Sequence, residues 1–237
     1  MKKKILLLHG WNNKYYSKYN ISDSWLYRKI FIDKLSEKYD LVKINFPGFC
    51  GELEPKKAWC LDDYAKYVKN YIDNSNIKFD YILGYSFGGA VAVKYAKLFD
   101  NKQKLILISP AIVRNTYHSK KMIKTPRVFN KIRNIIRDLY LKYIIKNPYM
   151  IDGTKFLNAS YQNIVREEVL NDLNELNGNN LLIIYGTNDD MVNPNYVYDQ
   201  VNQSIKKRIH FINDGTHDIA NTNPDDIMAI LDTYLTK

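Results

Sequence analysis

The sequence predicts an α/β fold in which a mostly parallel sheet of about six strands carries helices on both faces. Short apolar runs alternate with longer segments of helical periodicity along the 237 residues. Strand–helix alternation of this kind builds parallel sheets with right-handed crossovers. Several runs, such as Ile5-Leu6-Leu7-Leu8, are apolar at every position. Strands that are buried on both faces of a parallel sheet have this composition.

Six short apolar segments are expected to form the strands. In chain order they are residues 3–8, 41–46, 79–84, 105–109, 181–186 and 208–212. The segments between them predict helices. Residues 24–38 place Trp25, Ile30, Phe31 and Leu35 on roughly one face, and residues 61–73 do so with Leu61, Tyr64, Ala65, Val68 and Ile72. A third helix is expected over residues 87–99. Asn223-Pro224-Asp225 predicts the start of a closing helix that ends near Leu235.

One connection is much longer than a crossover helix requires. About 70 residues separate the fourth strand from the fifth, and such an excess is usually a functional insertion. We therefore divide the chain into a core domain of residues 1–110 and 178–237 and a helical insertion of residues 111–177, which is called the lid below. The net charge of +10 is concentrated in the lid, since residues 112–146 contain ten basic side chains against Asp138 alone.

Within the lid, residues 127–146 predict a basic amphipathic helix. The apolar face of this helix is expected to pack over the functional site of the core domain. Its basic face is then expected to lie in solvent. The alternative is that the basic face, with Lys131, Arg133 and Arg137, contacts an anionic lipid surface or an acidic substrate. Nucleic acid is not expected as a partner because no recognition fold accompanies the charge.

Composition excludes several other classes of protein. Apolar residues make up 46% of the chain and charged residues 25%, which are ordinary values for a globular domain. No apolar run reaches the length of about 18 residues that a transmembrane helix needs. The basic start is followed by only four apolar residues, too few for a signal peptide, so we expect a cytoplasmic protein. Cys50 and Cys60 are expected to be plain thiols.

The strongest chemical signal is Gly84-Tyr85-Ser86-Phe87-Gly88, which follows the third strand and opens a helix. This context is that of a nucleophile elbow, a tight turn that exposes a serine hydroxyl in a strained backbone conformation. Glycine is needed two positions before and two positions after the serine because side chains there would collide. Ser86 also lies at a helix N-terminus, where backbone N–H groups stabilise negative charge.

A serine hydroxyl needs a base, and the chain has four histidines. His217 is the expected base because its loop leaves the carboxyl end of the last strand, on the same edge of the sheet as Ser86. His9 is expected instead to pack beside its own loop and bond the backbone. The fifth strand ends near Asp189 and Asp190, and we choose Asp189 as the orienting acid because the Gly-x-x-Asp-x-x-Val spacing is the one seen in related folds.

These motifs resemble the α/β-hydrolases. The resemblance covers nearly the whole chain apart from the insertion and depends on His9-Gly10-Trp11, Pro47-Gly48-Phe49 followed by Gly51, the serine elbow, and the acid and histidine loops. It implies that the backbone N–H groups of Trp11 and Phe87 form the oxyanion hole. The usual antiparallel hairpin before the His-Gly strand is missing, so a shortened sheet is expected.

The sequence thus predicts a serine hydrolase that cleaves a small-molecule carboxylic ester through Ser86, His217 and Asp189, without metal or organic cofactor. The apolar character of several neighbours suggests an apolar acyl group and an esterase or monoglyceride-lipase-like activity. The residues expected to bind this substrate are Trp11, Tyr85, Phe87, Met191 and Val192. Three alternatives remain: a carbon–carbon bond hydrolase, a thioesterase or acyltransferase with the same triad, and a non-catalytic ligand-binding protein on a hydrolase fold.

Overall fold

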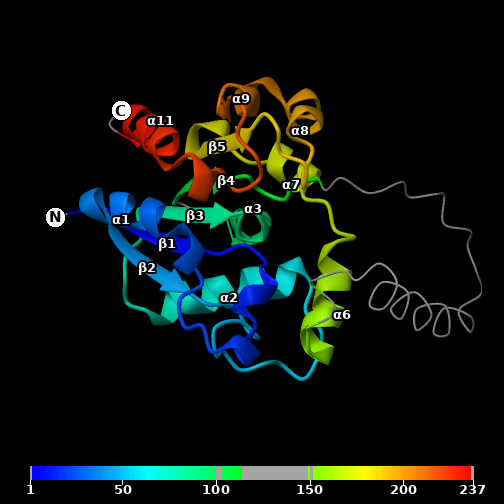
Figure 1. The fold of residues 1–237 in the computed structure, drawn as a ribbon. Helices are drawn as coiled ribbons and strands as arrows, with labels where there is room; N and C mark the ends of the chain where they lie inside the picture. The colour runs from blue at the N-terminus through cyan, green and yellow to red at the C-terminus, as the bar shows by residue number, and fades with distance from the viewer. Residues whose placement is uncertain (1, 100–102, 114–148, 150–151, 236–237) are drawn as a thin grey trace, which may run out of the picture.

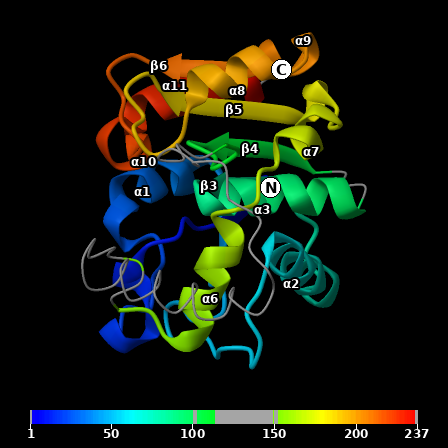
Figure 2. The ribbon, with the colours of Figure 1, turned by 90° about the vertical axis from the view of Figure 1, so that its right-hand side faces the viewer.

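The computed structural model describes residues 2–99, 103–113, 149 and 152–235. Within them, six strands form one parallel sheet in the order β2-β1-β3-β4-β5-β6. Figure 1 labels β1 to β5, and Figure 2 labels β6 beside β5. The strands are β1 (Lys4–Leu8), β2 (Asp40–Ile44), β3 (Tyr81–Tyr85), β4 (Lys104–Ile108), β5 (Leu181–Gly186) and β6 (Ile209–Ile212). The predicted strands and their parallel pairing are confirmed, with ends that differ by at most two residues.

Helices cover both faces of the sheet, as predicted (Figures 1 and 2). One face packs against α2 (Leu61–Asn74), α3 (Phe87–Phe99), α6 (Lys155–Ile164), α7 (Leu170–Asn174), α8 (Pro194–Gln200) and α9 (Gln203–Lys206). The other packs against α1 (Lys29–Lys38), α10 (Ile219–Thr222) and α11 (Pro224–Leu235). Successive residues of a strand point to opposite faces of the sheet, and each face has its own hydrophobic cluster. Leu6 and Leu8 belong to the first cluster, on the α2 and α3 side, and Ile5 and Leu7 belong to the second, on the α1 and α11 side.

The first predicted helix is too long at its start. The structure has a 3-10 helix, η3 (Leu26–Arg28), and α1 begins only at Lys29. Trp25, Phe31 and Leu35 are buried as expected, but Ile30 is 59% exposed and points away from the core. Because the backbone changes from a 3-10 helix to an α-helix at Lys29, the residues of α1 face other directions than a single helix from residue 24 would give them. The prediction assumed one uniform helix.

Several short elements were not predicted. Helices α8 and α9 lie between β5 and β6, and the 3-10 helices η1 (Asn13–Tyr15), η2 (Ser17–Tyr19) and η5 (Gly178–Asn180) lie in loops. Few of their residues are buried, for example Val197 in α8 and Ile205 in α9. A helix with so few core contacts leaves little periodicity in the sequence.

Most of the predicted lid lies outside the described residues, including the basic amphipathic helix of residues 127–146. Its lipid contact therefore stays a prediction. The described part contains α6 and α7, whose Leu157 and Leu173 are fully buried in the first hydrophobic cluster. Helix α6 is tied to the core by its Ser160 hydroxyl, which accepts a hydrogen bond of 2.9 Å from the Trp59 N–H group.

Among the residues that the structure describes, no helix has the length and apolar character needed to cross a membrane. The cytoplasmic location stays a prediction.

Candidate active site

Ser86 lies in a sharp turn between β3 and α3. Its φ is +51°, in the left-handed region that L-residues rarely adopt, so the turn holds the backbone strain expected of a nucleophile elbow. The turn is fixed on both sides of the residue. The Ser86 N–H group donates to the Ile108 carbonyl at 3.0 Å, and its own carbonyl accepts from the Gly89 and Ala111 N–H groups at 2.9 and 3.0 Å.

Glycines on either side make this turn possible. A Cβ on Gly84 would lie 2.5 Å from the Gly88 carbonyl oxygen, and a Cβ on Gly88 would lie 2.1 Å from the Leu8 carbonyl oxygen. Both distances are far inside van der Waals contact and involve backbone atoms. The predicted need for glycine at these positions is therefore confirmed, and the Gly88 contact extends it to the end of β1.

We expect Gly88→Ala to destabilise the fold by about 3–5 kcal/mol, because β1 and α3 must separate to admit the methyl group. Urea unfolding followed by circular dichroism measures this loss. Gly51→Ala is the control: its φ of +87° also disfavours alanine, but no atom lies within 4 Å of the new Cβ. The control should lose only about 1–2 kcal/mol. Equal losses in the two variants would contradict the close-contact explanation.

The loops after β5 and β6 are joined to one another beside this turn. The Thr187 N–H group donates to the Ile212 carbonyl at 3.0 Å, and the Asn188 N–H group donates to the Gly215 carbonyl at 2.8 Å. A Cβ on Gly186 would lie 2.1 Å from that same Gly215 oxygen. Glycine at position 186 thus lets the two loops come close enough for their side chains to meet.

The structure brings the three predicted catalytic side chains together in one chain of contacts. His217 Nε2 lies 2.9 Å from Ser86 Oγ, and His217 Nδ1 lies 2.8 Å from Asp189 Oδ2. The second carboxylate oxygen of Asp189 accepts from the Met191 and Val192 N–H groups at 3.0 and 3.1 Å. The Asp189 carboxylate is fully buried, so solvent screens little of the attraction between its negative charge and the imidazole. Asp190, the alternative acid, is exposed.

The loop after β1 reaches the same place. A Cβ on Gly10 would lie 3.3 Å from Ser86 Cβ, so Trp11 follows a residue in close contact with the turn. Neither the Trp11 nor the Phe87 backbone N–H group donates a hydrogen bond to another described residue. Phe87 is the first residue of α3, where the helix provides no acceptor for its N–H group. Within the part of the chain that the structure describes, both donors are thus available to an incoming oxygen atom.

His9 holds this loop and does not face Ser86. Its Nδ1 lies 2.8 Å from the Gly10 carbonyl oxygen, and its Nε2 accepts from the Phe46 N–H group at 3.0 Å. The neutral tautomer with hydrogen on Nδ1 satisfies both contacts. Complete burial lowers the pKa of His9 to about 4, which keeps the ring neutral. The expectation that His9 bonds the backbone is confirmed.

Protonation of His9 should make stability depend on pH. Its pKa of about 4 in the folded chain is below the ordinary value of 6.5, so the unfolded chain takes up the proton first as the pH falls. The stability is fully present above pH 6.5 and is lost from there toward pH 4. Between pH 7.5 and pH 5 the wild type should lose about 2 kcal/mol more than His9→Asn, measured by urea unfolding. Parallel pH profiles for the two proteins would refute this role.

A family model described as the alpha/beta hydrolase fold matches residues 3–148, more than half of the chain. The chain belongs to this family. The alpha/beta hydrolase fold explains the order of the three side chains, because its members carry serine, acid and histidine in this sequence along the chain.

Curated relatives resemble only part of this alpha/beta hydrolase. It is 29% identical over 110 residues to the dihydrolipoyllysine-residue acetyltransferase component of an acetoin cleaving system from Cupriavidus necator, covering 45% of this chain and 26% of that protein. It is 28% identical over 130 residues to a probable 1-acylglycerol-3-phosphate O-acyltransferase of Oryza sativa subsp. japonica, covering 50% of this chain and 28% of that protein. The matched regions span less than a third of either relative.

Solved structures match the fold over nearly its whole length. A carboxylesterase structure from Nitrososphaera gargenis has a TM-score of 0.65 at 14% identity, covering 99% of this alpha/beta hydrolase and 90% of that chain. A meta-cleavage product hydrolase from Pseudomonas fluorescens has a TM-score of 0.66 at 16% identity, with 99% and 90% covered. At such low identity these likenesses show the fold alone.

Two cavities of this alpha/beta hydrolase open beside Ser86 and His217. The larger, of about 310 Å³, is lined in part by Trp11, Tyr85 and Met191. The smaller, of about 40 Å³, is lined by Trp11, Phe87, Ala111, Tyr149, Tyr161, Met191 and Val192 together with the serine and histidine. The five residues expected to bind substrate therefore all line one cavity or the other. Phe87 and Val192 are almost completely buried and line the inner side of the smaller cavity.

Sequence reasoning missed a buried group in the larger cavity. The Arg28 side chain donates to the Tyr85 hydroxyl at 2.9 Å and lies 2.7 Å from Asp218 Oδ1. Tyr85 in turn lies 3.1 Å from the same Asp218 oxygen. These contacts connect the segment before α1 to the residue before Ser86 and to the residue after His217. Arg28 lies within an ordinary-looking helical segment, and no motif in the sequence marks it.

Proposed function

We propose that this chain is a serine hydrolase that cleaves a carboxylic ester through an acyl-enzyme intermediate on Ser86. The observation that carries the proposal is the continuous contact from Ser86 Oγ to His217 and from His217 to the buried carboxylate of Asp189, with separations of 2.9 and 2.8 Å. This geometry is the one in which an imidazole takes the proton of a serine hydroxyl. The fold family supports a hydrolase.

In this mechanism the Ser86 oxygen attacks the acyl carbon while His217 Nε2 takes the hydroxyl proton. Asp189 keeps hydrogen on His217 Nδ1, so Nε2 presents its lone pair to the serine, and its charge stabilises the imidazolium that forms. The imidazolium then gives its proton to the leaving alcohol. A water molecule, deprotonated by the same nitrogen, releases the acid from Ser86.

The developing oxyanion is held by the N–H groups of Trp11 and Phe87. Their lack of partners among the described residues supports this role, as does the contact of the Gly10 loop with the serine turn. Phe87 also lies at the N-terminus of α3, where the helix dipole favours negative charge. Each such donor contributes about 3–4 kcal/mol to transition-state stabilisation in other hydrolases.

The substrate is proposed to carry a short apolar acyl group. The smaller cavity has aromatic and aliphatic walls from Trp11, Phe87 and Val192, and its volume of about 40 Å³ admits only a few heavy atoms. The larger cavity is lined by polar groups from Arg28, Asp190 and Asp218 and suits the alcohol side of the ester. Apolar walls on one side and polar walls on the other give the ester one preferred orientation.

A series of p-nitrophenyl esters tests the proposal. We expect kcat/KM to be highest for the acetate or butyrate and to fall for the octanoate and palmitate. Hydrolysis of the long-chain esters at equal or higher rates would contradict the short acyl site. Absence of turnover with the whole series, together with failure to label Ser86, would instead favour a non-catalytic binding protein.

Acyl transfer is the second candidate function. It is favoured by the names of the two curated relatives, both of which denote acyltransferases. Transfer uses the same acyl-enzyme, and an alcohol or thiol replaces water in the second step. Product analysis with glycerol or a thiol added to the p-nitrophenyl acetate assay distinguishes the two reactions. A transferred acyl product that exceeds the free acid would establish the transferase.

Carbon–carbon bond hydrolysis is a further candidate because it requires the same residues. A vinylogous diketone assayed beside p-nitrophenyl acetate compares the two chemistries in one experiment. The proposed ester hydrolase should act on the acetate and leave the diketone unchanged. Faster cleavage of the diketone would replace the ester proposal with the carbon–carbon one.

A further inference from the structure

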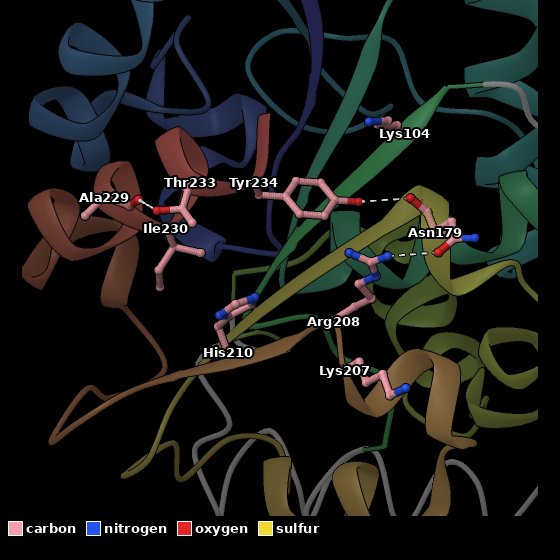
Figure 3. A pocket seen from close by; sticks show the side chains of 9 residues that line it. All are labelled: Lys104, Asn179, Lys207, Arg208, His210, Ala229, Ile230, Thr233 and Tyr234. Atoms are coloured by element: carbon pink, nitrogen blue, oxygen red, sulfur yellow. Dashed lines mark hydrogen bonds between the residues drawn. The ribbon is translucent and has the colours of Figure 1, made fainter. Parts of the chain in front are cut away.

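A third cavity, of about 590 Å³, is lined by residues of β4, β6 and α11 and of the loops before β5 and β6. Figure 3 shows its lining side chains. It lies at the end of the sheet opposite to Ser86. Lys104 begins β4 and pairs in register with Tyr81, the first residue of β3, whereas Ser86 follows the last residue of that strand. At about 3.3 Å per residue, five residues of strand separate the two levels by roughly 16 Å. The cavity is thus distinct from the proposed active site.

Four basic side chains line one part of this cavity. Lys104, Lys207, Arg208 and His210 contribute to it, and no carboxylate is among its described lining residues. No described carboxylate forms an ion pair with Lys104, Lys207 or Arg208. Three positive charges on the lining of one cavity, without ion-pair partners in the part of the chain that the structure describes, produce a potential that attracts an anion.

The Arg208 side chain is held in place for such a role. Its guanidinium donates to Asn179 Oδ1 at 2.8 Å and lies 5.9 Å from the centre of the Tyr234 ring. The Tyr234 hydroxyl donates to the Asn179 carbonyl at 3.3 Å, which fixes the ring as well (Figure 3). The remaining guanidinium N–H groups donate to no other described residue. A positioned guanidinium with free N–H groups matches the oxygens of a phosphate group.

Most of the other lining residues are apolar or aromatic. Ala229, Ile230 and Thr233 come from α11, and the Tyr234 ring contributes an aromatic surface next to the Lys104 ammonium, which lies 5.7 Å from the ring centre. The volume falls within the range of about 300–1,000 Å³ of small-molecule sites, which is more than a phosphate ion requires. The ligand should therefore carry an apolar or planar part besides its anionic group.

We propose that this cavity binds a small organic phosphate, with its phosphate group at the Arg208 side chain and its organic part against Ile230 and Tyr234, while the positive charges of Lys104 and Lys207 strengthen the attraction. A phosphate monoester is favoured over a carboxylate because its dianion balances more of the three positive charges. The site is independent of ester hydrolysis, since none of its residues comes from the serine, acid or histidine loops.

Calorimetric titration with adenosine 5′-monophosphate, phenyl phosphate and inorganic phosphate tests the proposal. At least one organic phosphate should bind saturably and more tightly than inorganic phosphate, and adenosine, which lacks the phosphate, should not bind. Binding should be the same in Ser86→Ala, which separates this site from the proposed active site. If neither organic phosphate binds saturably, or if inorganic phosphate binds as tightly as both, the proposal is wrong.

Charge variants locate the site on the protein. Lys104→Met and Lys207→Met should each weaken the binding about tenfold, because each removes one of the positive charges that attract the anion. Both side chains lie at the surface, so the fold should tolerate the change. Lys206→Met is the matched control: Lys206 lies over the Tyr198 ring and does not line the cavity. Equal weakening by Lys206→Met would show non-specific attraction and overturn the assignment.

Discussion

Ser86→Ala should lower kcat/KM for p-nitrophenyl acetate by about 10⁴-fold or more, because no other group can form the acyl-enzyme. The fold should remain, with a change in stability within about 1 kcal/mol, because the change leaves every backbone contact of the turn intact. The Ser86 N–H group still donates to Ile108, and its carbonyl still accepts from Gly89 and Ala111. Steady-state kinetics and urea unfolding measure the two quantities separately.

Ser109 provides a matched control for this experiment. It follows β4 as Ser86 follows β3, it has a φ of +43°, and it is completely buried. Its hydroxyl is not hydrogen-bonded to any described residue and contacts neither His217 nor Asp189. Ser109→Ala should therefore keep wild-type kcat/KM. Comparable losses in both variants would indicate general damage to the sheet edge and would remove the special role of Ser86.

Asp189→Asn is expected to lower kcat by about 10⁴-fold. The asparagine carbonyl oxygen can still accept from the Met191 and Val192 N–H groups, as Oδ1 of Asp189 does. Its NH₂ group then replaces Oδ2 beside His217 Nδ1. Because an NH₂ group donates, it favours the tautomer with hydrogen on Nε2, and that nitrogen can no longer accept the serine proton.

Asp190→Asn tests the choice between the two neighbouring acids. Asp190 is exposed and His217 Nδ1 is already paired with Asp189, so this variant should keep kcat within about threefold of wild type. Steady-state kinetics on the same ester gives both values. If Asp190→Asn loses more activity than Asp189→Asn, the assignment of the acid is wrong.

Much of this architecture could be predicted because its signals are local. A strand buried on both faces, such as Ile5-Leu6-Leu7-Leu8, differs from every neighbouring segment in composition. The serine turn needs glycine at positions 84 and 88 because a side chain there would collide with the backbone. This requirement is visible in the sequence as a short motif. A rule of topology placed the loops of Asp189 and His217, since loops after parallel strands meet at one edge of the sheet. The choice of Asp189 over Asp190 came from the spacing seen in related folds.

Features that depend on distant segments could not be predicted in this way. Arg28 meets Tyr85 and Asp218 only after three segments fold together, and the spacing around Arg28 looks like that of an ordinary helix. The basic cavity likewise joins side chains from β4, β6 and α11, none of which forms a motif by itself. In a chain with 35 basic residues, such a cluster cannot be recognised from the sequence.

Short helices with few buried residues could not be predicted from the sequence for a related reason. Helix α8 contributes only Pro194 and Val197 to the buried residues, so its sequence carries no clear stripe. The start of α1 was misplaced because Trp25 is buried from a turn and not from the helix. In both cases tertiary packing decides the backbone, and local periodicity does not report it.

The most direct test of the proposed chemistry is the site of covalent modification by a fluorophosphonate, an electrophile that reacts with activated serines. After reaction at neutral pH, mass spectrometry of the digested protein should place a single adduct on Ser86. The adduct should be absent from Ser86→Ala and should form much more slowly in Asp189→Asn. An unmodified Ser86 in folded protein, or an adduct on another serine of the wild type, would contradict the account.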